Sequence, residues 1–196
     1  MKVSAAILAG GLATRFGGRD KGALVVDGQT ILDRQLAMLS TITDDVMFVG
    51  GRTPAPRPGR AIADIVPGCG PLGGLHAALT AGRGSAVLLV ACDMPFVSSS
   101  FAAYLVSLAC DADMIVPRTE RGYHPLCAVY TGACLDAVSA RLADRRLRLR
   151  ELVDDVRTRV VPSEEIDRFG DRHRLLANVN TPTELAALET LQGHKL

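Results

Sequence analysis

The sequence has no tryptophan, and aromatic residues make up only 4% of its 196 positions. It also has no excess of charge of one sign, because 22 lysines and arginines are balanced by 21 aspartates and glutamates. The chain therefore has no global basic field that would attract nucleic acid or an anionic membrane surface. We expect neither partner.

Long apolar runs are absent as well. The longest, residues 85–92, is far shorter than the ~20 residues that a membrane-spanning helix needs. Lys2 and the apolar residues after it look superficially like a signal peptide, but Gly10, Gly11 and the charges that follow fit no cleavage pattern. We therefore expect a cytoplasmic protein without a membrane span.

Cysteines are few, and their spacing is not that of a disulfide-bonded or zinc-binding protein. There are five, an odd number, and no two of them form a C-x-x-C pair. Neither a disulfide scaffold nor a zinc site is indicated. We expect reduced, mostly buried thiols, none of which is a compelling nucleophile.

What the chain does contain is material for a core. Hydrophobic residues make up 48% of it, and the length favours one domain over residues 1–196. Apolar runs typical of buried strands alternate with segments of helical spacing. The expected strands are Val3–Leu8, Val46–Val49, Ala86–Ala91, 114–116 and 127–130, and the expected helices are 31–39, 72–81, 101–108, 134–142 and 149–153. This alternation predicts a three-layer α/β/α domain with a mostly parallel central sheet.

A further helix is predicted near the end of the sequence. Thr181, Pro182 and Glu184 occupy the N-cap, first and third helical positions of a capping box. The helix should extend to about Leu191.

A glycine-rich segment follows the first expected strand. Residues 8–22 contain five glycines together with Arg15 and Lys21. Such glycines let backbone N–H groups approach an anion, and the two cations supply charge for phosphates. The segment is not a Walker A loop, because G-x-x-x-x-G-K-[ST] is absent. We interpret it as a phosphate-binding loop, although a solvated surface loop is the simpler alternative.

Asp93 directly follows the buried strand Ala86–Ala91. Ligands of parallel α/β sheets bind beyond the carboxyl ends of the strands, so a carboxylate there can hold Mg²⁺ against substrate phosphates. The alternative is that Asp93 only caps the following segment. Taken alone, that alternative would be preferred.

Asp64 precedes a second glycine cluster. Gly68-x-Gly70-x-x-Gly73 formally matches a dinucleotide fingerprint. A true fingerprint follows a strong strand, however, whereas residues 61–65 form a weak one and Pro67 intervenes. We favour a tight loop that packs around a base or ribose before a helix that starts at Leu72.

The second half of the chain offers further polar candidates. Arginines suit phosphates and carboxylates because the guanidinium fork binds two oxygens at once. We read the run from Arg141 to Arg150 as a solvated helix face, and His124 alone is as readily a structural hydrogen-bonder as a site residue.

Taken in order, these motifs resemble the molybdenum cofactor guanylyltransferases (the MobA family) within the larger group of sugar-nucleotidyltransferase-like enzymes. The matching segments span nearly the whole chain: Leu8-Ala9-Gly10-Gly11, Gly18-Arg19-Asp20-Lys21-Gly22, Gly70-Pro71-Leu72-Gly73-Gly74, Cys92-Asp93-Met94-Pro95, His124-Pro125, Asp144-Arg145-Arg146 and Asn178-Val179-Asn180-Thr181-Pro182. The first and fourth suit the wider group, while the His-Pro and Asn-Val-Asn-Thr-Pro segments suit the branch that handles molybdopterin.

The resemblance implies a Rossmann-like nucleotidyltransferase fold and transfer of GMP from GTP to the phosphate of molybdopterin, free or carrying molybdenum, with release of pyrophosphate. It also implies roles for individual residues: Leu8, Ala9, Gly10 and Gly11 would line the guanine and phosphate site, Arg15 and Lys21 would hold the triphosphate, Asp64 would contact the nucleoside, Asp93 would bind Mg²⁺, and His124, Arg146, Asn178 and Asn180 would face the pterin. A molybdoenzyme or cofactor-delivery protein is an expected partner.

One segment departs from the family pattern. Relatives often have an asparagine just after the second strand, but this chain reads Gly50-Gly51-Arg52 there, so glycine backbone groups or Arg52 would have to replace it. Three alternatives remain open: transfer of CMP or of a nucleotide to another phosphorylated acceptor, an NAD-dependent oxidoreductase built on Gly68–Gly73, and a nonenzymatic nucleotide-binding adaptor.

Overall fold

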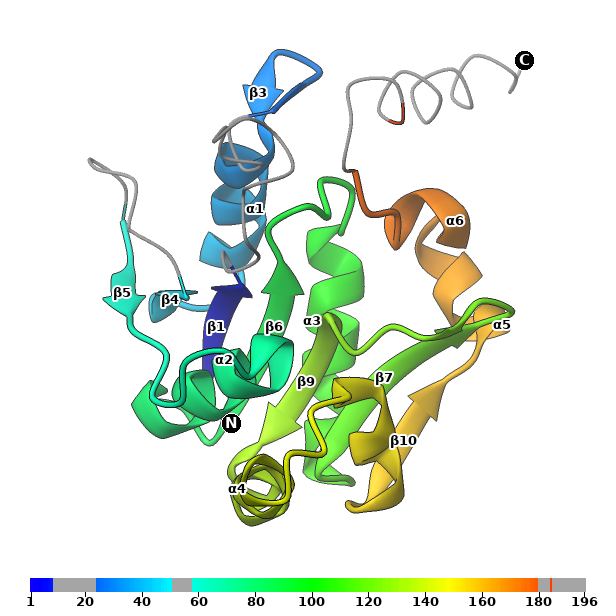
Figure 1. The fold of residues 1–196 in the computed structure, drawn as a ribbon. Helices are drawn as coiled ribbons and strands as arrows, with labels where there is room; N and C mark the ends of the chain where they lie inside the picture. The colour runs from blue at the N-terminus through cyan, green and yellow to red at the C-terminus, as the bar shows by residue number, and fades with distance from the viewer. Residues whose placement is uncertain (9–23, 51–57, 180–183, 185–196) are drawn as a thin grey trace.

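The computed structural model describes residues 1–8, 24–50, 58–179 and 184. Its centre is an eight-stranded sheet in the order β10-β7-β9-β6-β1-β4-β5, with β8 paired to β7 (Figure 1). The strands are β1 Val3–Leu8, β4 Val46–Val49, β5 Arg60–Ile62, β6 Ala86–Ala91, β7 Met114–Thr119, β8 Gly122–Tyr123, β9 Cys127–Thr131 and β10 Thr158–Val161. A separate hairpin is formed by β2 Val25–Val26 and β3 Gln29–Thr30.

The pairing pattern confirms the predicted fold. Strand β1 runs parallel to β4 and β6, β4 runs parallel to β5, and β7 runs parallel to β10. Strand β9 is antiparallel to both of its neighbours, β6 and β7. The sheet is therefore mixed but mostly parallel.

Helices cover both faces of this sheet (Figure 1). They are α1 Ile31–Ser40, α2 Gly70–Ala81, α3 Ser99–Ser107, α4 Leu135–Ala143, α5 Ser163–Ile166 and α6 Arg172–Leu175, with 3₁₀ turns η3 Leu108–Cys110, η4 Gly132–Cys134, η5 Leu149–Asp154 and η6 Asp167–Phe169. One apolar cluster joins the sheet to α1 and α3, and a second joins the other face to α2 and α4. The predicted three layers are present.

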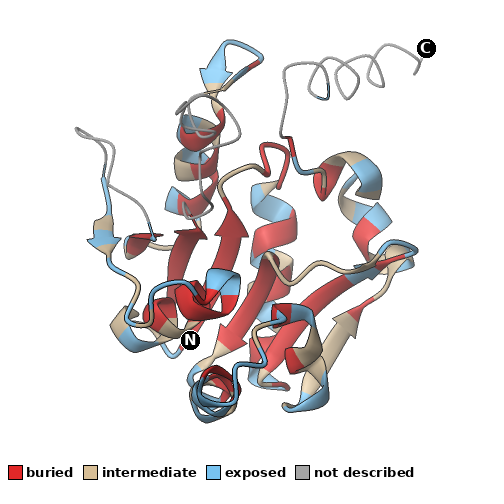
Figure 2. Cartoon of the chain, in the orientation of Figure 1, coloured by how far each residue is buried: buried red, intermediate tan, exposed pale blue. Residues whose placement is uncertain are grey.

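Strand β1 shows how the two layers share the sheet. Successive side chains of a strand point to opposite faces. Ala5 and Ile7 accordingly belong to the cluster with α1 and α3, and Ala6 and Leu8 to the cluster with α2 and α4. Every residue of β1 and β6 is buried, as Figure 2 shows for the middle of the sheet.

Two expectations about local structure were wrong. Helix α2 begins at Gly70 rather than Leu72, because Pro71 lies in its first turn, where a proline costs no hydrogen bond. Residues 149–153 lie in the 3₁₀ turn η5 and not in an α-helix. The predicted helix from Pro182 to Leu191 lies outside the described residues, apart from Glu184.

Arg141 also corrects the expectation of a solvated arginine face. Its side chain is only 1% exposed, its Nε lies 2.6 Å from Oδ2 of Asp155, and its Nη1 lies 3.5 Å from Glu151. The guanidinium fork can bind two carboxylates while its stem packs against apolar neighbours. Arg141 therefore ties α4 to η5.

All five cysteines are free thiols, and Cys69, Cys127 and Cys134 are buried. Burial raises the pKa of Cys127 and Cys134 to about 12, so their nucleophilic thiolate forms are scarce near neutral pH. Within the described part of the chain, every helix is too short or too polar to be a candidate membrane span.

Candidate functional site

The ends of β1 and β6 meet at the carboxyl edge of the sheet. Leu8 is paired with Ala91, and the backbone N–H of Cys92 donates to the carbonyl of Leu8 over 3.2 Å. Leu8 is the first residue of the glycine-rich segment 8–22, and the rest of that segment lies outside the described residues. The pairing of β1 with β6 therefore places Leu8, at the beginning of that segment, against Cys92, the residue before Asp93.

Asp93 lies in a tight turn after β6. The N–H of Met94 donates to the carbonyl of Ala91 over 3.2 Å, which closes the turn around Cys92 and Asp93. Asp93 is half-buried, whereas Ala91 and Met94 are buried. A buried strand thus presents this carboxylate at the sheet edge.

The segment after α6 reaches the same turn. Asn178 donates from Nδ2 to Oδ1 of Asp93 over 2.8 Å, and the N–H of Val179 donates to the carbonyl of Asp93 over 2.7 Å. Val179 is fully buried beside Phe96. The structure therefore joins Asp93 and Asn178, to which the resemblance assigns different roles, Mg²⁺ binding for Asp93 and the pterin for Asn178.

The second glycine cluster serves helix packing. A Cβ atom on Gly74 would lie 2.6 Å from Cδ2 of Leu8, and one on Gly73 would lie 3.1 Å from the carbonyl of Val66. Glycine at position 74 lets α2 approach β1 closely, and glycine at position 73 leaves room for the loop that precedes the helix. Gly68 and Gly70 have φ values of +78° and +58°, which favour glycine. The turn that Gly68 and Gly70 permit before α2 agrees with the expected tight loop.

Asp64 follows β5 and is partly exposed. Strand β5 lies two places from β1 in the sheet. Gly50, a suggested replacement for the family asparagine, uses its N–H to bind the carbonyl of Ile62 over 3.2 Å. That N–H is therefore engaged between β4 and β5, and Gly51 and Arg52 lie outside the described residues.

His124 closes the connection between β7 and β9. Its Nε2 lies 2.9 Å from the hydroxyl of Thr119, and its N–H donates to the carbonyl of Pro117 over 2.8 Å. Burial, helped by the positive charge of Arg121, lowers the pKa of His124. These contacts support the structural reading of this residue.

Arg146 lies in a different neighbourhood. Its side chain is 51% exposed and its Nη2 lies 3.6 Å from Oδ1 of Asp155. The adjacent Arg145 adopts a left-handed backbone with φ of +56°, and its Nη1 lies 3.8 Å from Sγ of Cys69, at the start of α2. The described structure thus brings Leu8, Asp93 and Asn178 together, while the contacts of His124 and Arg146 are local. Ala9, Gly10, Gly11, Arg15, Lys21 and Asn180 lie outside the described residues.

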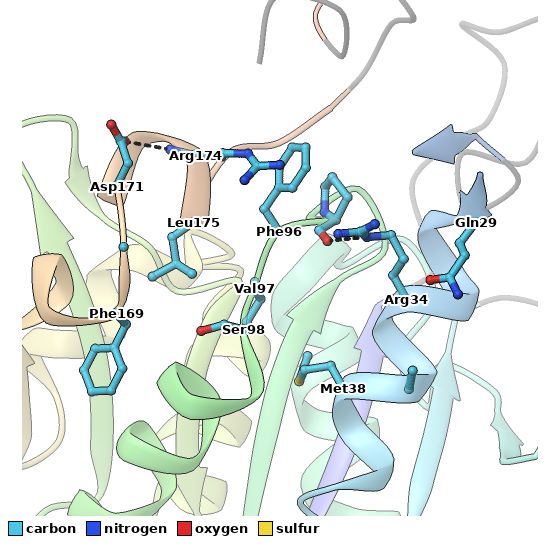
Figure 3. Close-up of a pocket in the computed structure, with 13 residues that line it drawn as sticks. Gln29, Arg34, Met38, Phe96, Val97, Ser98, Phe169, Asp171, Arg174 and Leu175 are labelled. Carbon is cyan, nitrogen blue, oxygen red and sulfur yellow. Dashed lines mark hydrogen bonds between the residues drawn. The ribbon is translucent and has the colours of Figure 1, made fainter. Parts of the chain in front are cut away.

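A groove of about 610 Å³ lies beyond the Asp93 turn, between α1 and α6 (Figure 3). The guanidinium carbons of Arg34 and Arg174 lie 5.9 and 4.3 Å from the centroid of the Phe96 ring, which lines this groove. Of the predicted site residues that the structure describes, Leu8, Asp64, Asp93, His124, Arg146 and Asn178, none lines this groove. The groove is therefore distinct from the Asp93–Asn178 contact.

The donor set at the sheet edge suits a magnesium ion bound with its substrate. Within the described residues there is no cluster of three or more histidine, cysteine or acidic side chains. Mg²⁺ needs no such cage, because it typically takes one or two carboxylates and completes its shell with phosphate oxygens and water. Asp93 fits that requirement, with the amide of Asn178 beside it.

Asp93 thus lies at the carboxyl edge of a mostly parallel sheet, next to the start of a glycine-rich segment, which is where open α/β sheets bind their ligands. Residues 5–160 match the family model described as the MobA-like NTP transferase domain. The chain belongs to this family, which confirms the resemblance.

Curated relatives agree with this placement. The chain is 33% identical over 187 residues to the "Probable molybdenum cofactor guanylyltransferase" of Pelotomaculum thermopropionicum, covering 94% of this chain and 91% of that relative. It is 30% identical over 191 residues to the "Molybdenum cofactor guanylyltransferase" of Desulfosudis oleivorans, covering 95% and 94%.

Solved structures share the fold. A "Molybdopterin-guanine dinucleotide biosynthesis protein A" from Archaeoglobus fulgidus superposes with a TM-score of 0.79 at 24% identity and covers 100% of both chains. A Mycobacterium tuberculosis protein solved as a complex with manganese gives a TM-score of 0.56 at 18% identity, over 90% of this chain and 98% of that one.

Proposed function

We propose that this chain transfers GMP from GTP to the phosphate of molybdopterin, forming the guanine dinucleotide and releasing pyrophosphate. The single observation that carries the proposal is the convergence of Leu8, Asp93 and Asn178 at one sheet edge in a member of the MobA-like family. The relatives' names supply the substrates. We further propose that residues 1–196 form one catalytic domain that works in the cytoplasm.

Asp93 is the proposed ligand of a divalent metal ion, which we take to be Mg²⁺. The ion, when bound, would neutralise phosphate charge and orient the triphosphate. Asp93 suits this task because it lies in a tight turn two residues after a fully buried strand, whose rigid backbone restricts where the carboxylate can lie.

The triphosphate is proposed to lie over the glycine-rich segment. Arg15 and Lys21 would hold its phosphates, Leu8, Ala9, Gly10 and Gly11 would line the guanine side, and Asp64 would contact the nucleoside. Charge matters here because the acceptor phosphate and the triphosphate repel each other until cations screen them. Each charge-assisted hydrogen bond contributes ~1.5–3 kcal/mol, so two cationic side chains can lower the barrier substantially.

No covalent enzyme intermediate is needed. The acceptor phosphate is already ionised near neutral pH and attacks the α-phosphorus directly, so the enzyme need not activate a hydroxyl or thiol. The raised pKa values of Cys127 and Cys134 agree with this.

The acceptor is proposed to approach Asp93 from the side of Asn178, with Asn180 and Arg146 as further contacts. The contact of Asn178 with Asp93 supports this direction, because it connects the segment after α6 to the residue that would hold the metal. His124 is the weakest member of the acceptor set, since its ring already binds Thr119. We expect the labile product to pass to a delivery protein or molybdoenzyme.

Pyrophosphate release tests the proposal. With Mg²⁺ and molybdopterin present, GTP should support release and CTP should support little. A preference for CTP would favour the CMP-transferring alternative. Release that does not depend on molybdopterin would contradict the proposed acceptor.

A further inference from the structure

Helix α1 carries one fully enclosed polar side chain. Gln35 is 2% exposed and shares the inner face of the helix with Ile31 and Leu39, one turn away on either side. Taking an amide out of water is unfavourable unless its hydrogen bonds are replaced. Among the described residues its Oε1 is buried without a hydrogen-bond partner, so only the partners of its Nε2 offset this cost and indicate why a polar residue stands at a core position.

Those partners are the two ends of the Asp93 turn. Nε2 of Gln35 donates to the carbonyl of Ala91 over 2.7 Å and to the carbonyl of Met94 over 3.1 Å. An amide nitrogen has two protons, so each carbonyl receives one. Because both acceptors are carbonyls, only the NH₂ group can face them, and the orientation of the amide is fixed.

Neighbouring bonds hold the rest of the same loop. Arg34, also on α1, donates from Nε to the carbonyl of Pro95 over 3.3 Å, and the N–H of Val179 donates to that of Asp93. Hydrogen bonds from α1 or from the segment after α6 thus reach four backbone carbonyls of the loop, those of residues 91, 93, 94 and 95. Of the described side chains that donate to them, only that of Gln35 is fully buried and binds on both sides of Asp93.

We propose that Gln35 is a positioning residue that sets the direction of the Asp93 carboxylate through the backbone of its turn. The inference rests on the proposed function, since it takes Asp93 to be the metal ligand. Without the amide, the carbonyls of Ala91 and Met94 lose a buried donor and the turn relaxes. The side chains of a metal and phosphate site must be held within ~0.5 Å of their productive positions, so a small relaxation of the turn should weaken metal binding.

The test compares two substitutions on one helix face. Gln35→Met keeps the length of the side chain but removes the two donors, whereas Leu39→Ala removes a buried apolar side chain one turn later and leaves the hydrogen bonds of Gln35 to the turn in place. The readouts are Mn²⁺ affinity by electron paramagnetic resonance with GTP present, backbone hydrogen exchange at Met94, and the melting temperature.

The expected result separates positioning from stability. Gln35→Met should raise the Mn²⁺ dissociation constant ~10-fold and speed exchange at Met94. Leu39→Ala should lower the melting temperature at least as much as Gln35→Met does, but it should change the Mn²⁺ dissociation constant by no more than about twofold. Gln35→Asn shortens the side chain by one methylene and so withdraws the amide from the two carbonyls. It should also weaken Mn²⁺ binding, and it replaces Gln35→Met in the test if that variant does not fold.

Two outcomes would overturn the inference. The first is unchanged Mn²⁺ affinity in both Gln35 variants, and the second is an equal loss in Leu39→Ala. Asp93→Ala distinguishes this failure from failure of the proposed function. If Asp93→Ala abolishes Mn²⁺ binding while the Gln35 variants do not change it, only the role of Gln35 is wrong. If Asp93→Ala leaves binding intact, the metal assignment fails and the inference fails with it.

Discussion

Asn178 donates a 2.8 Å hydrogen bond to Oδ1 of Asp93, although 85 residues separate them in the chain. The N–H of Val179 adds a second bond to the backbone of Asp93. A segment expected to contact the acceptor therefore meets the carboxylate expected to hold the metal. Group transfer requires this proximity, because the two reacting phosphates must be brought together.

Asp93→Ala should abolish transfer and leave the fold intact. A half-buried carboxylate at a strand end adds little to the core, so the melting temperature should change by only a few degrees. Pyrophosphate release at saturating Mg²⁺ should fall by more than ~100-fold. Asp27→Asn, which alters an exposed carboxylate paired with Arg34, is the matched control and should retain activity. Near-normal turnover of Asp93→Ala would refute the metal assignment.

Asn178→Ala should impair both metal use and turnover. Loss of the amide removes the side-chain hydrogen bond to Oδ1 of Asp93, so the carboxylate should be less well oriented. The Mg²⁺ concentration for half-maximal rate should rise ~3–10-fold, together with a lower kcat. A titration of the rate with Mg²⁺ at saturating GTP measures this. If only the KM for molybdopterin changed, Asn178 would be an acceptor residue and nothing more.

Arg146→Ala should affect the acceptor more than the nucleotide. The side chain is half-exposed and lies 3.6 Å from Asp155, which also binds Arg141, so its removal should cost little stability. The KM for molybdopterin should rise ~10-fold while the dissociation constant of GTP stays within about twofold. Arg148→Ala, at a position that is 74% exposed, is the control. Equal losses for both substrates would remove the proposed division of the site.

The pH dependence of stability should report on Asp45. Burial tends to raise the pKa of this carboxyl, but hydrogen bonds from Ser4 and Arg60, aided by the N–H of Arg83, outweigh burial and hold it below its usual value. A depressed folded-state pKa gives stabilisation that is present above the unfolded pKa and is lost as the pH falls through the folded one.

Asp45→Asn should therefore lower the melting temperature at pH 7 by several degrees, and the difference from the unchanged protein should shrink below about pH 4. Thermal denaturation from pH 7 to pH 3 measures it. A gap that stayed constant over this range would show that the carboxylate's charge does not matter. Asp45 contacts Ser4 near the start of β1, Arg60 at the start of β5 and Arg83 before β6, away from the carboxyl edge of the sheet, so GTP affinity at pH 7 should be unchanged.

Much of the fold could be predicted because its signals are local. Continuous apolar runs marked β1 and β6, and the rule that ligands lie beyond the carboxyl ends of parallel strands led directly to Asp93. The antiparallel course of β9 could not be read from its own residues, because it depends on which neighbours the strand pairs with.

The residues that sequence analysis missed depend on distant partners. Gln35 was the only polar residue among Ile31, Leu32, Met38 and Leu39 on the buried face of α1, and that exception was the available signal. Its purpose became visible only once Ala91 and Met94 were in place. Arg141 looked like part of an exposed run, because its burial depends on Asp155, 14 residues later.

The proposed magnesium-bound triphosphate is tested most directly by a crystal structure with Mg²⁺ and a non-hydrolysable GTP analogue. We predict that the ion is coordinated by the carboxylate of Asp93 and by phosphate oxygens, with the triphosphate against residues 9–21 and Asn178 still beside Asp93. A nucleotide bound instead in the groove lined by Phe96 and Arg174, with no metal at Asp93, would contradict the proposal.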